Sequence, residues 1–103
     1  MAYEFTLSDV DSLSFYDIYL YTNPKNKNVS IPESFPLQIR WTSPRCDVYV
    51  EDVWMSVSSR KQEYREAMSF PYGGQWKMSV YIQRGSTDKI NGLGITWRRY
   101  GTR

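Results

Sequence analysis

Apolar and polar residues alternate with a period of two along five stretches of this 103-residue chain. Such alternation predicts strands that are buried on one face. The apolar positions are, in chain order, Tyr3, Phe5 and Leu7; Tyr16, Ile18 and Leu20; Leu37, Ile39 and Trp41; Trp76, Met78, Val80 and Ile82; Ile95 and Trp97. We expect Trp41, Trp76 and Trp97 to share one dry interior between two sheets.

The segment 47–58 departs from this simple alternation. Val48 and Val50 share one parity, whereas Val53 and Met55 share the other. Because a slip of one residue turns every following side chain to the opposite face, we expect a break or a bulge near residues 51–52. The break would give one strand near 47–50 and another near 53–58, and the alternative is a single bulged strand.

The connections are marked by proline, glycine and asparagine. Thr22–Pro36 contains three prolines and is predicted to be a long loop rather than a helix or a central strand. Residues 84–93 are expected to form a structured corner that includes the turn pair Asn91–Gly92. A short helix is allowed near residues 60–67, after the cap-like Ser59, but it would hold about two turns at most.

These elements predict an all-β fold. Six or seven short strands without alternating helices favour an antiparallel two-sheet β-sandwich of the immunoglobulin-like kind, and a small barrel is the alternative. Aromatic residues make up 17% of the chain, which is typical of β-rich proteins. The length fits a single domain over residues 1–103.

The residues with reactive side chains are few. The chain has no histidine and one cysteine, which excludes the usual histidine-based nucleophile systems, histidine zinc sites and an intrachain disulfide. Asp9 and Asp11 are spaced as in part of a calcium loop, but too few oxygen ligands surround them, and bonding to nearby backbone is the expected role. Glu51 and Asp52 would point to opposite faces of a strand. We therefore predict a non-enzymatic protein without metal or cofactor, and we expect Cys46 to be half-buried.

The candidate binding residues are Tyr19, Tyr21, Arg98 and Tyr100. The two tyrosines at 19 and 21 lie on the face of their strand opposite the apolar positions. This pattern fits either packing under the following loop or a surface for a partner protein or a sugar. Arg98, Arg99 and Lys77 are the residues that a nucleic-acid site would use, but a net charge of +2 argues against such a site.

Three segments resemble a known family when they are taken in order. "FYDIYLYT", "FPLQIRWTSP" and "FPYGGQWKMSVYIQ…DKINGLGITW" together are similar to the gliding-motility lipoprotein H family, and Ile90, Gly92, Leu93, Gly94 and Ile95 match the corner before its last strand. The resemblance implies an exported, lipid-anchored, non-enzymatic accessory protein on the periplasmic side. The lipidated cysteine of that family is absent from this chain.

The expected function is that of a non-catalytic cell-envelope domain that works through contacts with partner proteins. Its location would be periplasmic or associated with the outer membrane if the resemblance holds, and cytoplasmic otherwise. The membrane would be reached through a lipid anchor alone. The alternatives are a carbohydrate-binding or phage structural β-module and a weak nucleic-acid-binding protein.

Overall fold

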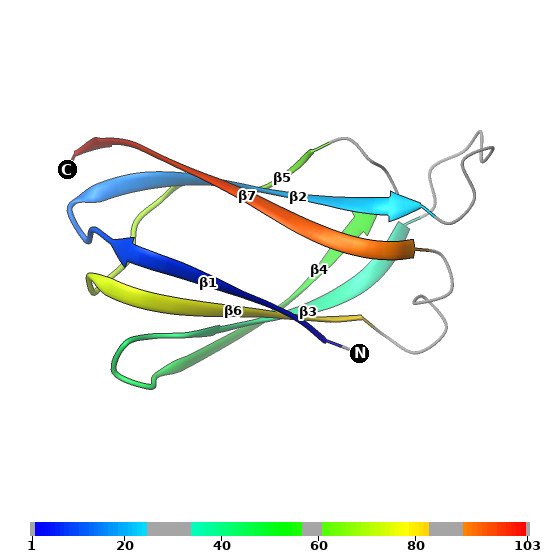
Figure 1. Cartoon of the computed structure of the whole chain (residues 1–103), viewed down its shortest axis with the longest axis horizontal. Helices are drawn as coiled ribbons and strands as arrows, with labels where there is room; N and C mark the ends of the chain where they lie inside the picture. The colour runs from blue at the N-terminus through cyan, green and yellow to red at the C-terminus, as the bar shows by residue number, and fades with distance from the viewer. Residues whose placement is uncertain (1, 25–33, 57–60, 83–89, 103) are drawn as a thin grey trace.

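The computed structural model describes residues 2–24, 34–56, 61–82 and 90–102 and forms a sandwich of two antiparallel sheets (Figure 1). Its seven strands are β1 (Ala2–Val10), β2 (Ser14–Pro24), β3 (Ser34–Thr42), β4 (Val48–Ser56), β5 (Gln62–Met68), β6 (Gly74–Ile82) and β7 (Ile90–Thr102). One sheet has the order β1-β6-β3-β4 and the other has the order β5-β2-β7. The predicted all-β sandwich is confirmed, and the described residues contain no helix.

The order of the strands determines which of them lie at an edge. The central pairs β2–β5 and β3–β6 are those of an immunoglobulin sandwich, in which the second strand pairs with the fifth and the third with the sixth. The terminal strands differ, because β1 pairs with β6 and β7 pairs with β2. The four edge strands are therefore β1 and β4 in one sheet and β5 and β7 in the other.

The segment near 60–67, where a short helix was allowed, contains strand β5 instead. Its residues pair with β2, from Leu20 opposite Gln62 to Tyr16 opposite Met68. A helix of about two turns is too short to be stable alone, so the pairing with β2 decides the conformation of this segment. The pairing shifts register twice, and Ala67 adopts a positive φ of 53°.

Strand β4 is continuous, so the predicted break or bulge near residues 51–52 is wrong. It pairs with β3 without a shift, from Ser34 opposite Ser56 to Thr42 opposite Val48. The change of apolar parity has another cause. Val48 and Val50 lie on the outer face of the sheet and are about half exposed, whereas Met55 is buried.

The predicted loop Thr22–Pro36 is shorter than expected at both ends. Strand β2 continues to Pro24 and β3 begins at Ser34, while residues 25–33 lie outside the described part of the chain. Pro36 lies within β3, opposite Trp54 of β4. The described pairing of β3 with β6 begins at Leu37, so the missing N–H of Pro36 falls outside that ladder. Residues 83–89, most of the predicted corner, are also outside the described part.

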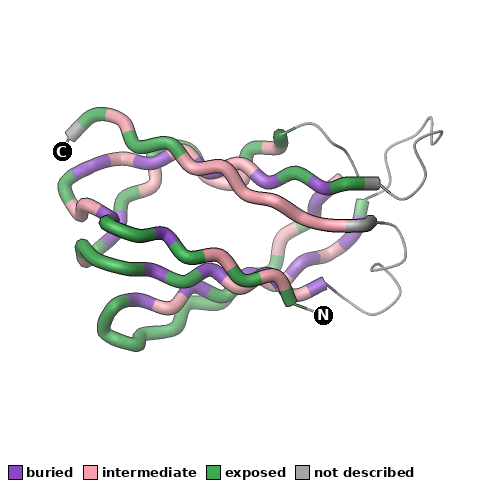
Figure 2. Tube along the Cα trace, viewed as in Figure 1, coloured by how far each residue is buried: buried purple, intermediate pink, exposed green. Residues whose placement is uncertain are grey.

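The core is formed by the inner faces of both sheets. Along the strands, residues that point inward and are buried alternate with residues that are more exposed (Figure 2). Trp41 and Trp76 are buried, as predicted. Trp97 is half-buried; it packs against the core and stacks on Tyr16, with ring centroids 5.4 Å apart. The fourth tryptophan, Trp54, is 73% exposed on β4.

Candidate functional site

The four predicted binding residues lie on one surface, the outer face of the three-stranded sheet. Directly opposite residues of an antiparallel pair share a face. The register places Phe15 opposite Tyr100, Asp17 opposite Arg98, Tyr19 opposite Thr96 and Tyr21 opposite Gly94. The structure therefore brings Tyr19, Tyr21, Arg98 and Tyr100 to the same side of β2 and β7.

Packing accounts for part of this aromatic surface. The Tyr21 ring lies across Gly94, where an added Cβ would come within 2.2 Å of the Tyr21 Cζ atom. The ring of Tyr100 lies 6.3 Å from that of Phe15. Desolvation, followed by the nearby Asp17 carboxylate, raises the pKa of Tyr100 above its ordinary value. A shallow hollow of about 330 Å³ remains between Tyr19 and Arg98.

The three basic residues expected of a nucleic-acid site are not brought together. Lys77 lies on β6, in the other sheet. Arg98 and Arg99 are neighbours in β7 and therefore point to opposite faces. The nearby Glu66 carboxylate raises the pKa of Glu63, so acidic side chains also gather along β5. The arrangement does not form a continuous basic surface.

A surface that the sequence did not predict lies on β4. Six large hydrophobic residues are exposed among the described residues, and four of them, Val48, Tyr49, Val50 and Trp54, belong to this strand. Figure 2 shows the exposed stretch through the turn between β3 and β4 and into β4. Val48, Val50 and Trp54 lie on the outer face with Asp52 among them, and we call these four residues the outer row of β4. Exposed apolar side chains on an edge strand are typical of a contact surface.

The hydrogen bonds of β4 show which of its backbone groups point to the open side. The N–H of Ser43 donates to the carbonyl of Asp47 over 2.9 Å, so these two residues form a hydrogen-bonded pair beside the turn. Hydrogen-bonded and non-hydrogen-bonded pairs alternate along an antiparallel ladder. The non-hydrogen-bonded pairs are therefore Thr42–Val48, Arg40–Val50, Gln38–Asp52 and Pro36–Trp54. The backbone N–H and C=O groups of the outer row consequently point away from β3, to the open edge.

The far end of β4 gives the same assignment independently. The amide N–H of Ser56 donates to Gln62 Oε1 over 3.0 Å, and Gln62 Nε2 donates to the carbonyl of Ser56 over 2.7 Å. Ser56 thus directs both backbone groups away from β3, as the alternation requires. Pro36 is consistent with this assignment, because a residue at a non-hydrogen-bonded position of the β3–β4 ladder donates no N–H to β4.

The other three edges differ from β4. The pairing of β1 with β6 shifts between Leu7 and Val10, and Asp9 has a positive φ of 56°. The pairing of β5 shifts twice, and β7 presents the exposed Arg98 and Arg99. Bulges and charges of this kind discourage the addition of another strand. Among the described residues, β4 alone combines an unshifted edge with large exposed apolar side chains.

An aromatic cleft of about 270 Å³ opens beside β4, between the two sheets. Tyr49, Val50 and Glu51 line it from β4, and Tyr64, Arg65 and Met68 line it from β5. Its floor is formed by Trp41, Phe70 and Trp76, which are buried and in ring contact with one another. A mostly apolar concave surface of this kind suits an apolar side chain.

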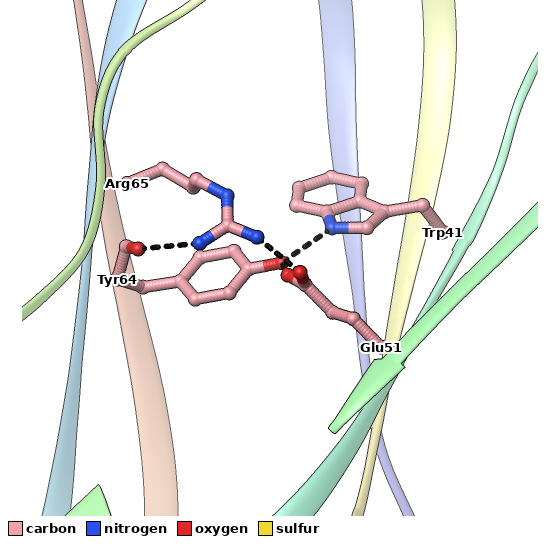
Figure 3. Close-up of polar contacts among 4 residues, drawn as sticks. All are labelled: Trp41, Glu51, Tyr64 and Arg65. Atoms are coloured by element: carbon pink, nitrogen blue, oxygen red, sulfur yellow. Dashed lines mark hydrogen bonds and ion pairs between the residues drawn. The ribbon is translucent and has the colours of Figure 1, made fainter. Parts of the chain in front are cut away.

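A polar network closes one side of this cleft (Figure 3). The Tyr64 hydroxyl donates to Glu51 and accepts from Trp41 Nε1, the latter over 2.9 Å. Arg65 forms an ion pair with Glu51, donates to the Tyr64 carbonyl over 3.1 Å, and lies 4.5 Å from the centre of the Tyr64 ring. Burial, followed by the hydrogen bond to Glu51, raises the pKa of Tyr64 well above its ordinary value. Glu51 is thus engaged within the protein, while Asp52 points to the opposite face, as predicted.

The other residues singled out in the sequence have structural surroundings. Asp11 accepts hydrogen bonds from the Leu13 N–H at 2.9 Å and from the Ser14 hydroxyl at 3.0 Å, and both bonds lower its pKa. The predicted backbone bonding of this residue is confirmed. Cys46 is exposed in the turn before β4, so the expectation that it is half-buried is wrong. In the described part of the chain, no three acidic, cysteine or histidine side chains gather closely enough to hold a metal ion.

Comparison with known proteins gives no relative. No family model, curated protein or solved structure matches this chain. Within the described ranges, no helix has the length and apolar character needed to cross a membrane.

Proposed function

We propose that this protein is a non-catalytic interaction domain that binds a partner protein by adding one of the partner's strands to β4. The observation that supports this most directly is the coincidence of two features along the outer row. Its backbone N–H and C=O groups point to the open edge, and three of its four side chains are exposed and apolar. Strand addition uses main-chain hydrogen bonds for affinity and alternate side chains for specificity.

The test uses a proline that removes an edge-facing donor. Val50→Pro deletes an N–H that makes no bond to β3, so the fold should tolerate it while strand addition is blocked. Thr6→Pro in β1 is a matched control. Thr42 directs its backbone groups away from β4, so Thr42 and Lys77 are assigned as a hydrogen-bonded pair of β3 and β6. Thr6 lies opposite Lys77 on the other side of β6, and its N–H is therefore assigned to the open side of β1.

A displayed library of random dodecapeptides is selected on the wild-type protein, and the enriched peptides are measured against both variants. We expect wild type and Thr6→Pro to bind them equally and Val50→Pro to bind at least about tenfold more weakly, because one or two main-chain hydrogen bonds are lost. Equal binding by folded Val50→Pro would contradict the proposal. Circular dichroism verifies that both variants are folded.

The cellular location stays a prediction. The resemblance to gliding-motility lipoproteins supports a domain in the cell envelope, where it would act as an accessory protein. The test is the coding sequence upstream of Met1 together with fractionation of the source cells. An encoded export signal and lipidation cysteine would support the envelope, and recovery of the native protein in the soluble cytosolic fraction would oppose it.

Carbohydrate binding is a second candidate, favoured by one observation. Tyr19, Tyr21 and Tyr100 share the outer face of the three-stranded sheet with Arg98, and a hollow lies between Tyr19 and Arg98. Aromatic faces beside hydrogen-bonding side chains suit sugar rings. Binding on a glycan array that Tyr19→Ala abolishes would support this function, and an array without signal would oppose it.

A further inference from the structure

The side chains along the β4 edge indicate the chemistry of the strand that it would accept, and this inference rests on the proposed function. Residues 47–56 contain three carboxylates, Asp47, Glu51 and Asp52, and no lysine or arginine. Asp47 accepts from the Ser43 hydroxyl and Glu51 is paired with Arg65, so both are engaged. No hydrogen bond or ion pair engages the Asp52 carboxylate within the described part of the chain.

The nearest row of the sheet leaves this charge uncompensated. Asp52 lies opposite Gln38 on β3. Arg40 is the next residue along that face, but its guanidinium lies 5.1 Å from the centre of the Tyr81 ring on the far side of β3. An opposite charge placed directly across a strand pair is stabilising, and a like charge is destabilising.

A second copy of this chain does not meet that requirement. In an antiparallel pairing of two β4 strands, the register that uses the whole outer row pairs Val48 with Trp54 and sets Glu51 opposite Glu51 of the partner copy. Two registers use three of the four residues: one sets Asp52 opposite itself, and the other sets Val50 opposite itself and Asp52 opposite Val48. None of the three registers places a positive charge opposite Asp52, so the edge disfavours a symmetric dimer.

The aromatic cleft defines the other face of the incoming strand. Side chains of an added strand alternate between the outer face and the space between the sheets. Those that turn inward would pass the mouth of the cleft, where Tyr49 of β4 and Met68 of β5 form apolar walls. The Glu51 and Arg65 charges at this mouth satisfy each other. The cleft therefore favours an apolar inward side chain.

From these observations we infer that the partner is an extended peptide segment with a lysine or arginine opposite Asp52 on its outer row and apolar residues on its inner row. The outer row of β4 thus selects by charge, and the aromatic cleft selects by apolar contact. Main-chain pairing along Val48–Trp54 provides the shared, sequence-independent part of the binding.

The probe is a fluorescein-labelled nonapeptide of sequence TVTLKLTVT. Because it is symmetric about its lysine, it can place that lysine opposite Asp52 in either strand direction. We expect saturable binding by fluorescence anisotropy, about fivefold weaker when the lysine is replaced by glutamate. In the Asp52→Lys variant the preference should reverse, so that the glutamate peptide binds more tightly. Equal affinity of the two peptides for wild type would overturn the inference.

Two further arms separate this inference from the proposed function. In antiparallel pairing, N-methylation at the third and seventh positions removes amide donors that face β4 and should abolish binding, whereas N-methylation at the fourth and sixth should not; in parallel pairing the two results are exchanged. If this contrast holds while the lysine and glutamate peptides bind alike, strand addition stands and the charge selection fails. If neither peptide binds while the dodecapeptide selection succeeds, the inferred chemistry is wrong and the proposed function remains supported. A concentration-dependent dimer in sedimentation, lost in Val50→Pro, would make a second copy the occupant and overturn the inference.

Discussion

Gln62 hydrogen-bonds both the amide N–H and the carbonyl of Ser56, so a side chain of β5 occupies the place that a further strand would take at the end of β4. This contact satisfies the edge at one residue. The preceding four residues that face the same way, Val48, Val50, Asp52 and Trp54, are those that the proposed partner would engage.

Amide hydrogen exchange should distinguish the two sides of β4. We expect fast exchange at Val48, Val50, Asp52 and Trp54, whose N–H groups point to the open edge. Slower exchange is expected at Tyr49, Glu51, Val53 and Met55, which bond to β3. The measurement is residue-resolved exchange by NMR, and uniform protection along β4 would contradict the assignment.

The Ser56 amide provides an internal control for that experiment. Its N–H faces the open side but is bonded to Gln62, so it should exchange more slowly than Trp54. Gln62→Ala removes the acceptor and should raise the Ser56 rate towards that of Trp54, with no change at Glu51. An unchanged Ser56 rate would show that the contact is not maintained in solution.

Adjacent substitutions in β4 should have very different effects on the free energy of unfolding. Met55 is 5% exposed and Trp54 is 73% exposed. We expect Met55→Ala to cost about 2 kcal/mol or more through loss of buried contacts. Trp54→Ala should change stability by about 0.5 kcal/mol or less. Urea unfolding measures both values, and a larger loss for Trp54→Ala would mean that this side chain is packed.

Gly94 and Tyr21 should be energetically coupled. Gly94 lacks a positive φ, so alanine suits its backbone, but the new Cβ would meet the Tyr21 ring. We expect Gly94→Ala to destabilise the wild-type protein by about 1 kcal/mol, as overpacking does. In a Tyr21→Ala background the same change should be neutral or stabilising. A double-mutant cycle from urea unfolding measures the coupling, and additive effects would contradict the packing.

Stability should fall at alkaline pH because of Tyr64. Its pKa is raised in the folded protein, so above its ordinary value of 10.0 the unfolded chain loses a proton that the folded protein retains. The stabilising contribution is therefore complete below about pH 10 and declines as the pH rises further. We expect Tyr64→Phe to flatten the decline of the unfolding free energy between pH 9 and 11 that is measured in urea. An unchanged slope would show that Tyr64 has an ordinary pKa.

The sequence predicted the elements in which one face is fully buried. The alternations through Leu37–Trp41 and Trp76–Ile82 belong to β3 and β6, which are central strands, and there the period of two maps directly onto burial. For β5 the weak local preference suggested a helix, and the pairing with β2 overrides that preference. Local propensity cannot reveal such a long-range partner.

The candidate surface was missed for a related reason. The apolar parity change across Val48–Met55 predicts a slip between core faces, whereas β4 pairs with β3 without a shift. A continuous strand whose first half is exposed would have the same sequence pattern as a bulged or broken strand. Only the position of β4 at the edge of the sheet distinguishes these two structures. Trp54, out of step with Val53 and Met55, was the available signal that apolar residues occupy both faces. The predicted Tyr19, Tyr21, Arg98 and Tyr100 do share a face, because the β2–β7 register aligns them.

The bulges and charges along β1, β5 and β7 have a consequence for stoichiometry. A protein with one edge strand open to strand addition can bind one ligand strand, but it cannot extend into a filament because no second edge accepts the next molecule. Removing the register shift of β1 near Asp9 would open a second edge to main-chain pairing, and the protein could then polymerise.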